Sequence, residues 1–248
     1  MKYEEASWYS PHVNREMRIR IYGHYGVPFI CFPCQEKQSD DFASNGMINA
    51  LKDYIESGKI KLFCVDSNDD ETVASTSWDR AHATYMWSQY HFYIVEEVLP
   101  FVRFKQGGGE CYPYLLGCSM GATHAAINFF RRPELFAGFI GLSGNYDAGY
   151  FFSDYFDSNA YDNSPCHFLD NMDPNHPYIS LYNSKRMIVC IGSGAYEYLV
   201  GYSNYWLKEV TDRKGINVEY NFWDELAIHD WPSWHYEARY FIDRILYE

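Results

Sequence analysis

A serine flanked by glycines lies near the middle of the chain, in the sequence GCSMG at 117–121. An apolar run, 113–118, precedes it, and a helix-compatible run, 120–130, follows it. This G-x-S-x-G spacing is typical of a sharp strand-to-helix turn, on which larger side chains at the glycine positions would collide with neighbouring elements. The turn exposes the serine hydroxyl, and the first amide of the helix faces the place where an oxyanion would form. We therefore predict that Ser119 is a nucleophile and that the backbone of Met120 donates to the oxyanion.

A serine hydroxyl needs a positioned base before it can attack a carbonyl at neutral pH. The histidines well downstream of the turn are His167, His176, His229 and His235. Only His229 falls between the expected last strand and the expected last helix, where a loop can bring an imidazole onto the serine. His235 is the nearest competitor, but it falls inside the helical run. We therefore predict that His229 is the base.

The base in turn needs a carboxylate that holds its ring in the correct tautomer. Glu197 is the first carboxylate after the apolar strand that ends at 191. Asp224 and Glu225 are the alternatives, but they stand only five and four residues before the histidine, which makes its far ring nitrogen hard to reach. Glu197 is the preferred acid.

These residues are separated by apolar strands that alternate with amphipathic helices. That alternation predicts a mostly parallel central sheet with helices on both faces. An antiparallel N-terminal hairpin is expected at one edge, and the whole chain, 1–248, is expected to form a single domain. The expected strands are 3–9, 16–22, 28–33, 59–65, 113–118, 136–144, 186–191 and 217–223, and the expected helices are 46–57, 78–104, 120–130, 202–213 and 232–247.

The segment 145–185 is too long for a plain connection between two strands. It is rich in Asp, Asn, Tyr and Phe and contains several prolines. We expect it to fold as short helices that form a cap-like insertion over the site. The alternative is a structural excursion that packs away from the site.

Composition excludes several classes of partner. The formal charge of −13 argues against binding to nucleic acid or to an anionic membrane, which would require a basic surface. The N-terminus has acidic residues where a secretory signal would be apolar, and no run of eighteen apolar residues occurs. We expect a soluble, cytoplasmic protein without a cofactor.

The seven cysteines fall mostly within apolar, strand-like runs, as expected for core residues in a reducing compartment. Cys31 and Cys34 have redox-motif spacing, but Pro33 lies between them and no helix follows directly, so we interpret the spacing as coincidence. No cysteine and histidine grouping has the spacing of zinc ligands, and no metal site is expected.

Several motifs together resemble the esterase D-like family of the α/β-hydrolase superfamily, over nearly the whole chain from 28 to 246. They are FP at 32–33 followed by GMI at 46–48, ESGKIKLFCVDS at 56–67, LGCSMGA around the serine, FAGFIGLSG at 136–144 and HDWPSW at 229–234. The last is similar to the H-D-W-x-x-W of that family, in which the histidine is the base. The resemblance implies an α/β-hydrolase fold with Ser119 and His229 as catalytic residues.

One loop departs from the family pattern. The loop that follows FP usually contains glycine and supplies the second oxyanion donor, whereas here it reads CQEKQ at 34–38. A backbone donor needs no particular side chain, so the amide of Cys34 or Gln35 is expected to serve.

The prediction from these residues is a serine hydrolase that cleaves a small-molecule carboxylic ester through an acyl-enzyme. Acyl transfer to another acceptor, or thioester cleavage, would use the same site. A third hypothesis is an inert scaffold of this fold that binds ligands or partners, which the altered loop at 34–38 makes conceivable.

Overall fold

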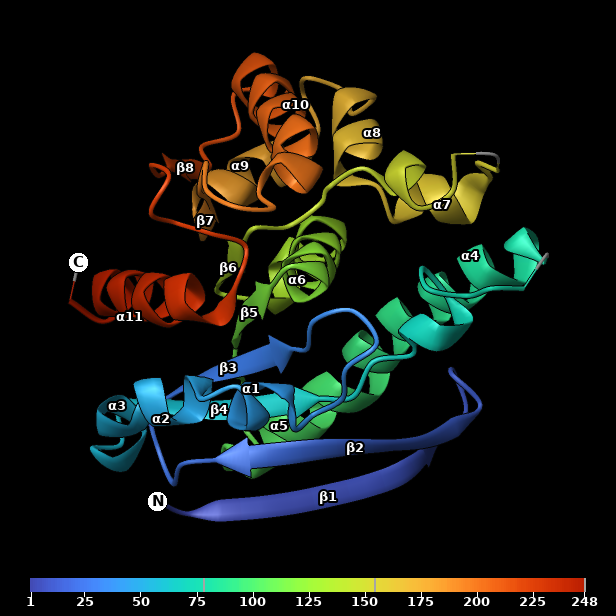
Figure 1. The fold of residues 1–248 in the computed structure, drawn as a ribbon. Helices are drawn as coiled ribbons and strands as arrows, with labels where there is room; N and C mark the ends of the chain where they lie inside the picture. The colour runs from blue at the N-terminus through green and yellow to red at the C-terminus, as the bar shows by residue number, and fades with distance from the viewer. Residues whose placement is uncertain (78, 154, 248) are drawn as a thin grey trace.

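The structure, a computed structural model, describes residues 1–77, 79–153 and 155–247. Its strands are β1 (Tyr3–Ser10), β2 (Arg15–Tyr22), β3 (Val27–Phe32), β4 (Ile60–Val65), β5 (Tyr114–Cys118), β6 (Gly138–Leu142), β7 (Arg186–Ile191) and β8 (Glu219–Phe222). They form one sheet in the order β1-β2-β4-β3-β5-β6-β7-β8 (Figure 1). β4, β3, β5, β6, β7 and β8 run parallel, whereas β1 and β2 form an antiparallel hairpin that joins β4 at one edge. The predicted fold class is confirmed.

The described helices are α1 (Asp41–Ser44), α2 (Met47–Ala50), α3 (Lys52–Glu56), α4 (Arg80–Phe92), the π-helix η2 (Tyr93–Val98), α5 (Leu99–Lys105), α6 (Met120–Arg131), α7 (Ser158–Asp162), α8 (Pro165–Asp170), α9 (Pro177–Asn183), α10 (Tyr198–Lys214) and α11 (Trp231–Tyr247). Short 3-10 turns are η1 (Asp69–Glu71), η3 (Pro133–Leu135) and η4 (Ala148–Tyr150). The helices divide between the two faces of the sheet, and each face has its own hydrophobic core. One core receives side chains from α4, α5, α6 and α10, and the other receives them from α1, α2, α3 and α11.

The central strands are buried on both faces, because helices cover both. Every residue of β4 and β6 is buried, and Leu115 to Cys118 of β5 are also buried. This explains why these strands carry apolar residues at nearly every position, with Lys61 of β4 as an exception, rather than at alternate positions. The sheet is therefore a rigid base for the loops that follow its parallel strands.

Three predicted helices differ from the observed ones. The run 46–57 is divided into α2 and α3, since Leu51, at φ −100° and ψ 8°, leaves the helical region between them. The run 78–104 is helical from α4 through η2 to α5, although its predicted start at residue 78 lies outside the described residues. The helix expected at 202–213 begins earlier, at Tyr198.

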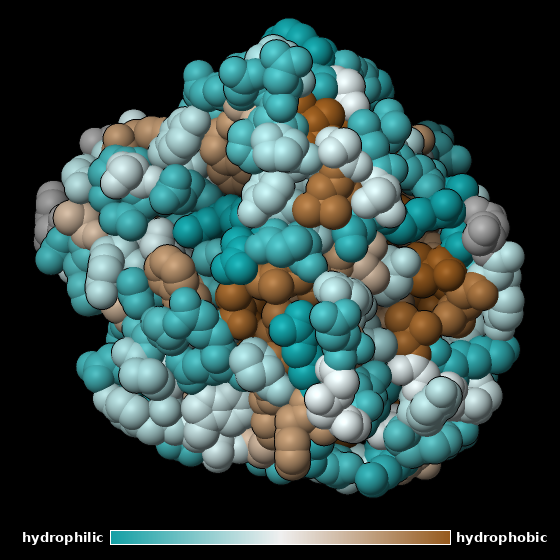
Figure 2. All heavy atoms as spheres, turned by 180° about the vertical axis from the view of Figure 1, so that it is seen from behind, coloured by the Kyte–Doolittle hydropathy of each residue, from teal (hydrophilic) through white to brown (hydrophobic). Residues whose placement is uncertain are grey.

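The unusual aromatic content divides between core and surface. Phenylalanines dominate the largest buried rings, whereas most of the exposed large hydrophobic residues are tyrosines, whose hydroxyl groups favour contact with water. On the face seen from behind, hydrophobic residues form separate small areas within a mostly polar surface (Figure 2). Of the helices within the described residues, none is both long and apolar enough to cross a lipid bilayer.

Candidate active site

Ser119 stands on a sharp turn between β5 and α6. Its φ of 53° and ψ of −123° lie in a region that non-glycine residues rarely adopt, and its amide donates to the carbonyl of Leu142 at 2.8 Å. The two flanking glycines have no room for a side chain. A Cβ on Gly117 would lie 2.1 Å from the carbonyl carbon of Gly121, and one on Gly121 would lie 2.4 Å from the carbonyl oxygen of Phe32. The spacing of the motif therefore follows from close backbone packing.

Gly117→Ala is expected to destabilise the protein by about 3 kcal/mol or more, because the new methyl group meets backbone atoms that cannot move aside. Thermal unfolding of the purified variant measures the effect. Gly201→Ala is the matched control: it lies in α10 with no atom within 4 Å of a new Cβ, so alanine should be neutral or slightly stabilising there. Equal unfolding temperatures for the two variants would contradict this account of the turn.

The structure brings Ser119, His229 and Glu197 into one hydrogen-bonded chain. Nε2 of His229 lies 2.9 Å from Oγ of Ser119, and Nδ1 of His229 lies 3.3 Å from Oε2 of Glu197. The carboxyl group of Glu197 is almost fully buried, while the His229 side chain remains 16% exposed. The arrangement can move a proton from the hydroxyl to the imidazole while the carboxylate stabilises the imidazolium.

All three side chains come from the same edge of the sheet. Ser119 follows β5, Glu197 lies in the loop after β7, and His229 lies in the loop after β8. The carboxyl ends of parallel strands meet at one edge, which is where open α/β sheets place their ligand sites. The loops are also bonded to each other, since the amide of His229 donates to the carbonyl of Ala195 at 3.0 Å.

Glu197 is held from behind by two residues that we did not predict as part of the site. Oε1 of Glu197 accepts from Oγ of Ser143 at 2.6 Å, and that hydroxyl accepts from Nε1 of Trp234 at 3.0 Å. The ring centroid of Trp234 also lies 5.1 Å from that of His229. Trp234 belongs to the H-D-W-x-x-W pattern and Ser143, at φ 55°, belongs to the FAGFIGLSG motif, but neither pattern indicates that the two residues meet at Glu197.

The remaining histidine candidates lie elsewhere. His235 bonds to the carbonyl of Asn45 at 2.8 Å, His167 lies 2.8 Å from Oγ of Ser164, and His176 accepts from the amide of Tyr178 at the start of α9. Each of the three has a local structural partner that explains its position.

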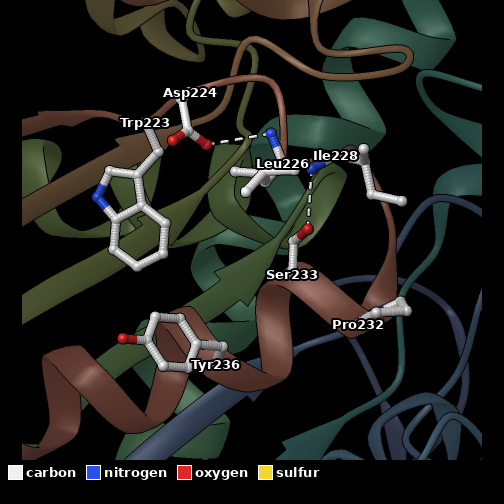
Figure 3. Close-up of a pocket in the computed structure, with 8 residues that line it drawn as sticks. Trp223, Asp224, Leu226, Ile228, Pro232, Ser233 and Tyr236 are labelled. Carbon is white, nitrogen blue, oxygen red and sulfur yellow. Dashed lines mark hydrogen bonds between the residues drawn. The ribbon is translucent and has the colours of Figure 1, made fainter.

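The carboxylate that His229 contacts is Glu197, and the alternative acids lie in other surroundings. Glu225 is exposed, and Asp224 accepts from the amide of Leu226 at 3.1 Å. Asp224 lines a separate cavity of about 400 Å³ between the loop after β8 and α11, together with the rings of Trp223 and Tyr236 (Figure 3). This cavity does not contain Ser119, Glu197 or His229 among its lining residues.

The candidate oxyanion donors are backbone amides at the start of α6 and in the loop after β3, and they differ in whether each amide already has a hydrogen-bond partner. Met120 is the first residue of α6, so its amide has no partner within the helix. The amide of Cys34 donates to Oδ2 of Asp41 at 2.8 Å, which turns it away from the site. Gln35 lines the cavity at Ser119 and, among the described residues, no partner is found for its amide. Of the two predicted loop donors, only Gln35 has an amide without a partner among the described residues.

The cavity beside Ser119 measures about 160 Å³. Its polar wall carries Thr123 and Asn145, and its apolar wall carries Leu199 and Val200 from α10. The segment 145–185 contributes Tyr150 and Phe151 to the same cavity. Within the described ranges, no three His, Cys, Asp or Glu side chains meet in a way that could hold a metal ion.

One further carboxyl group lies beneath the site. Glu237 of α11 is fully buried, and neither of its carboxyl oxygens has a hydrogen-bond partner within the described residues. Burial, with a smaller effect from the negative charge of Glu197, raises its pKa to about 8. Glu237 is therefore mostly protonated and neutral at pH 7.

Known structures resemble this chain over nearly its whole length, although no protein-family model and no curated protein matches it in sequence. A ferulic acid esterase superposes with a TM-score of 0.74 at 16% identity, covering 98% of each chain. An S-formylglutathione hydrolase from Staphylococcus aureus superposes at 0.71 with 13% identity, covering 99% of this chain and 98% of that one. The chain has the α/β-hydrolase fold.

Another S-formylglutathione hydrolase, from Agrobacterium tumefaciens, superposes on this α/β-hydrolase fold with a TM-score of 0.68 at 14% identity, covering 98% of this chain and 92% of that one. The three neighbours named here are thus a ferulic acid esterase and two S-formylglutathione hydrolases. At such low identity the likeness carries the fold, and the chemistry has to be argued from the side chains.

Proposed function

We propose that this protein is a serine esterase that hydrolyses a small-molecule carboxylic ester. The observation that carries the proposal is the continuous chain of hydrogen bonds from Oγ of Ser119 through His229 to the buried Glu197. Such a chain activates a hydroxyl group that is otherwise a weak nucleophile.

In the proposed reaction, Oγ of Ser119 attacks the ester carbonyl while Nε2 of His229 accepts its proton. The oxyanion of the tetrahedral intermediate accepts hydrogen bonds from the amides of Met120 and Gln35. His229 then gives the proton to the leaving alcohol, and an acyl-enzyme remains on Ser119. A water molecule, deprotonated by His229, attacks this acyl-enzyme and releases the carboxylic acid.

The small cavity supports a preference for short acyl groups. Phe151 and Tyr150, from the segment 145–185, line a volume of only about 160 Å³ together with Leu199 and Val200 of α10. We propose that this part of the segment shapes the acyl site, as expected of a cap-like insertion. Cytoplasmic localisation is part of the same proposal, since all seven cysteines are free.

The test combines active-site labelling with a panel of p-nitrophenyl esters of increasing acyl length. Wild-type protein should react with a fluorophosphonate probe and should hydrolyse the acetate and butyrate esters faster than the longer ones. Ser119→Ala should remain unlabelled. An acyl thioester belongs in the panel, because two structural neighbours are named S-formylglutathione hydrolases. Wild-type protein that is neither labelled nor active would favour the inert scaffold.

The pH profile checks the role of the imidazole separately. Only the neutral ring of His229 can accept the proton of Ser119, so kcat/KM should fall when the solution is acidified. A profile that does not fall on the acidic side would contradict a histidine base.

A further inference from the structure

The loop after β3 adopts an unfavourable backbone conformation without the help of glycine. Glu36 has a φ of 57°, which non-glycine residues rarely adopt and which costs about 1 kcal/mol or more. Gln35, the residue before it, carries the proposed oxyanion amide. The surrounding structure must therefore hold this loop in place, and the contacts of Glu36 indicate how.

Two aspartates bind the amides on either side of Gln35. The amide of Cys34 donates to Oδ2 of Asp41 at 2.8 Å, and the amide of Glu36 donates to Oδ2 of Asp69 at 3.1 Å. Since both flanking amides are directed at carboxylates, the amide between them is left for the site, where Gln35 lines the cavity beside Ser119.

Asp69 also connects this loop to the helix that carries the other donor. Its Oδ1 lies 3.0 Å from Nε2 of His124, which belongs to α6 one turn after Met120. Both partners are buried, with side chains 0% and 1% exposed. The ring of His124 is packed 4.8 Å from that of Tyr90, so it has little freedom to move.

One carboxyl group thus bridges the two elements that would form the oxyanion hole. Oδ2 of Asp69 holds the loop with Gln35, and Oδ1 holds the helix with Met120. Because a buried bridge between two rigid partners fixes the separation of the elements, it also fixes the distance between the two donor amides. This role explains how a loop without glycine keeps its shape.

We propose that Asp69, paired with His124, is a positioning residue that sets the oxyanion hole by holding the loop at 34–38 against α6. The inference rests on the proposed esterase function. It assigns a role to the acidic segment after β4, which the sequence does not suggest.

The decisive measurement compares an ester with its thiono analogue, in which sulfur replaces the carbonyl oxygen. Sulfur is larger and accepts hydrogen bonds weakly, so the preference for the oxygen ester reports on the two donor amides. Asp69→Ala should lower kcat by about 10- to 100-fold with little change in KM, since loss of one whole donor costs about 10²–10³. It should also lower the oxygen-over-sulfur preference by a similar factor.

Asp70→Ala is the matched control. Asp70 is the adjacent residue of the same acidic segment, it is more than half exposed, and it pairs on the surface with Arg15. Removing it deletes the same charge but no contact to the loop, so both kcat and the oxygen-over-sulfur preference should stay at the wild-type level. General damage to the fold would slow both substrates equally and leave their ratio unchanged.

Two more variants keep the test decisive if Asp69→Ala does not fold. Asp69→Asn should retain most activity, because its side-chain amide can still accept from the amide of Glu36 and keep a hydrogen bond to the ring of His124. His124→Phe keeps the ring packing but loses the bond to Asp69, and it should lower the oxygen-over-sulfur preference.

The outcomes separate the inference from the function on which it rests. A wild-type-like preference in Asp69→Ala, or in His124→Phe when the alanine variant is unfolded, would overturn the positioning role of Asp69. Wild-type protein without hydrolysis and without labelling of Ser119 would instead overturn the esterase proposal itself.

Discussion

Replacing Ser119 with alanine is expected to lower kcat for a short-chain ester by about 10⁵–10⁶-fold. His229→Ala should cost about as much, and the double variant should be no worse than either single one, because the nucleophile and base act as a unit. Glu197→Gln should cost about 10⁴-fold, since an amide in place of the carboxylate favours the wrong histidine tautomer. Steady-state kinetics of the folded variants measures these losses.

Matched controls are available for the base and for the acid. His235→Ala removes the competing histidine directly after the HDWPSW motif, whose ring bonds to the backbone of Asn45, and Glu225→Gln removes an exposed acid near His229 in sequence. Both should keep kcat within a few-fold of wild type. Additive losses for Ser119 and His229, or a large loss for either control, would show that the hydrogen-bonded chain is not the catalytic unit.

Glu237→Gln is expected to stabilise the protein above neutral pH by up to about 5 kcal/mol. The folded protein raises the pKa of this buried carboxyl group from its ordinary 4.5 to about 8, chiefly through burial and then through the charge of Glu197. Each pH unit over which only the folded state keeps the proton costs about 1.4 kcal/mol of stability.

The direction of this effect follows from proton binding. Below about pH 4.5 the carboxyl group is protonated in both states, so it does not alter the free energy of unfolding. Between about pH 4.5 and 8 the unfolded chain releases the proton while the folded protein retains it, and the free energy of unfolding falls as the pH rises. Above about pH 8 both states are ionised and the loss is complete. Glutamine cannot ionise, and it should remove this decline.

Denaturant unfolding of wild type and Glu237→Gln from pH 5 to 9 checks this prediction. The difference between the two proteins should be small at pH 5 and largest near pH 8 to 9. Glu209→Gln serves as the control, because Glu209 is 73% exposed and its substitution should leave the pH dependence of wild type unchanged. A difference that does not vary with pH would mean that Glu237 titrates normally.

Much of the site was predictable because its residues stand at positions with local signatures. The glycines around Ser119 are required because a Cβ on Gly117 or Gly121 would lie only 2.1 or 2.4 Å from a backbone atom. His229 was placed by its position between the last strand and the last helix, and Glu197 by its position after β7. The hydrophobic pattern indicates where each strand ends, and the order of the chain indicates which residues follow it. Both positions can therefore be found from the sequence.

The contacts that support the site were not predictable in the same way. Ser143 and Trp234 are 91 residues apart and meet behind Glu197, and Asp69 is 55 residues from His124. Neither pair has a spacing or motif that indicates a contact. The sequence also leaves both Cys34 and Gln35 as candidates for the loop donor, whereas in the structure the amide of Cys34 donates to Asp41.

The sequence by itself determined the parallel sheet, the edge hairpin, the sharp turn at Ser119 and the candidates for base and acid, because these depend on local periodicity and on the order of elements. Only the tertiary structure decided which buried polar groups meet one another. A buried carboxyl or hydroxyl group has to find its hydrogen-bond partner wherever packing brings one within reach. For Asp69, Ser143 and Trp234 that partner comes from a distant part of the chain.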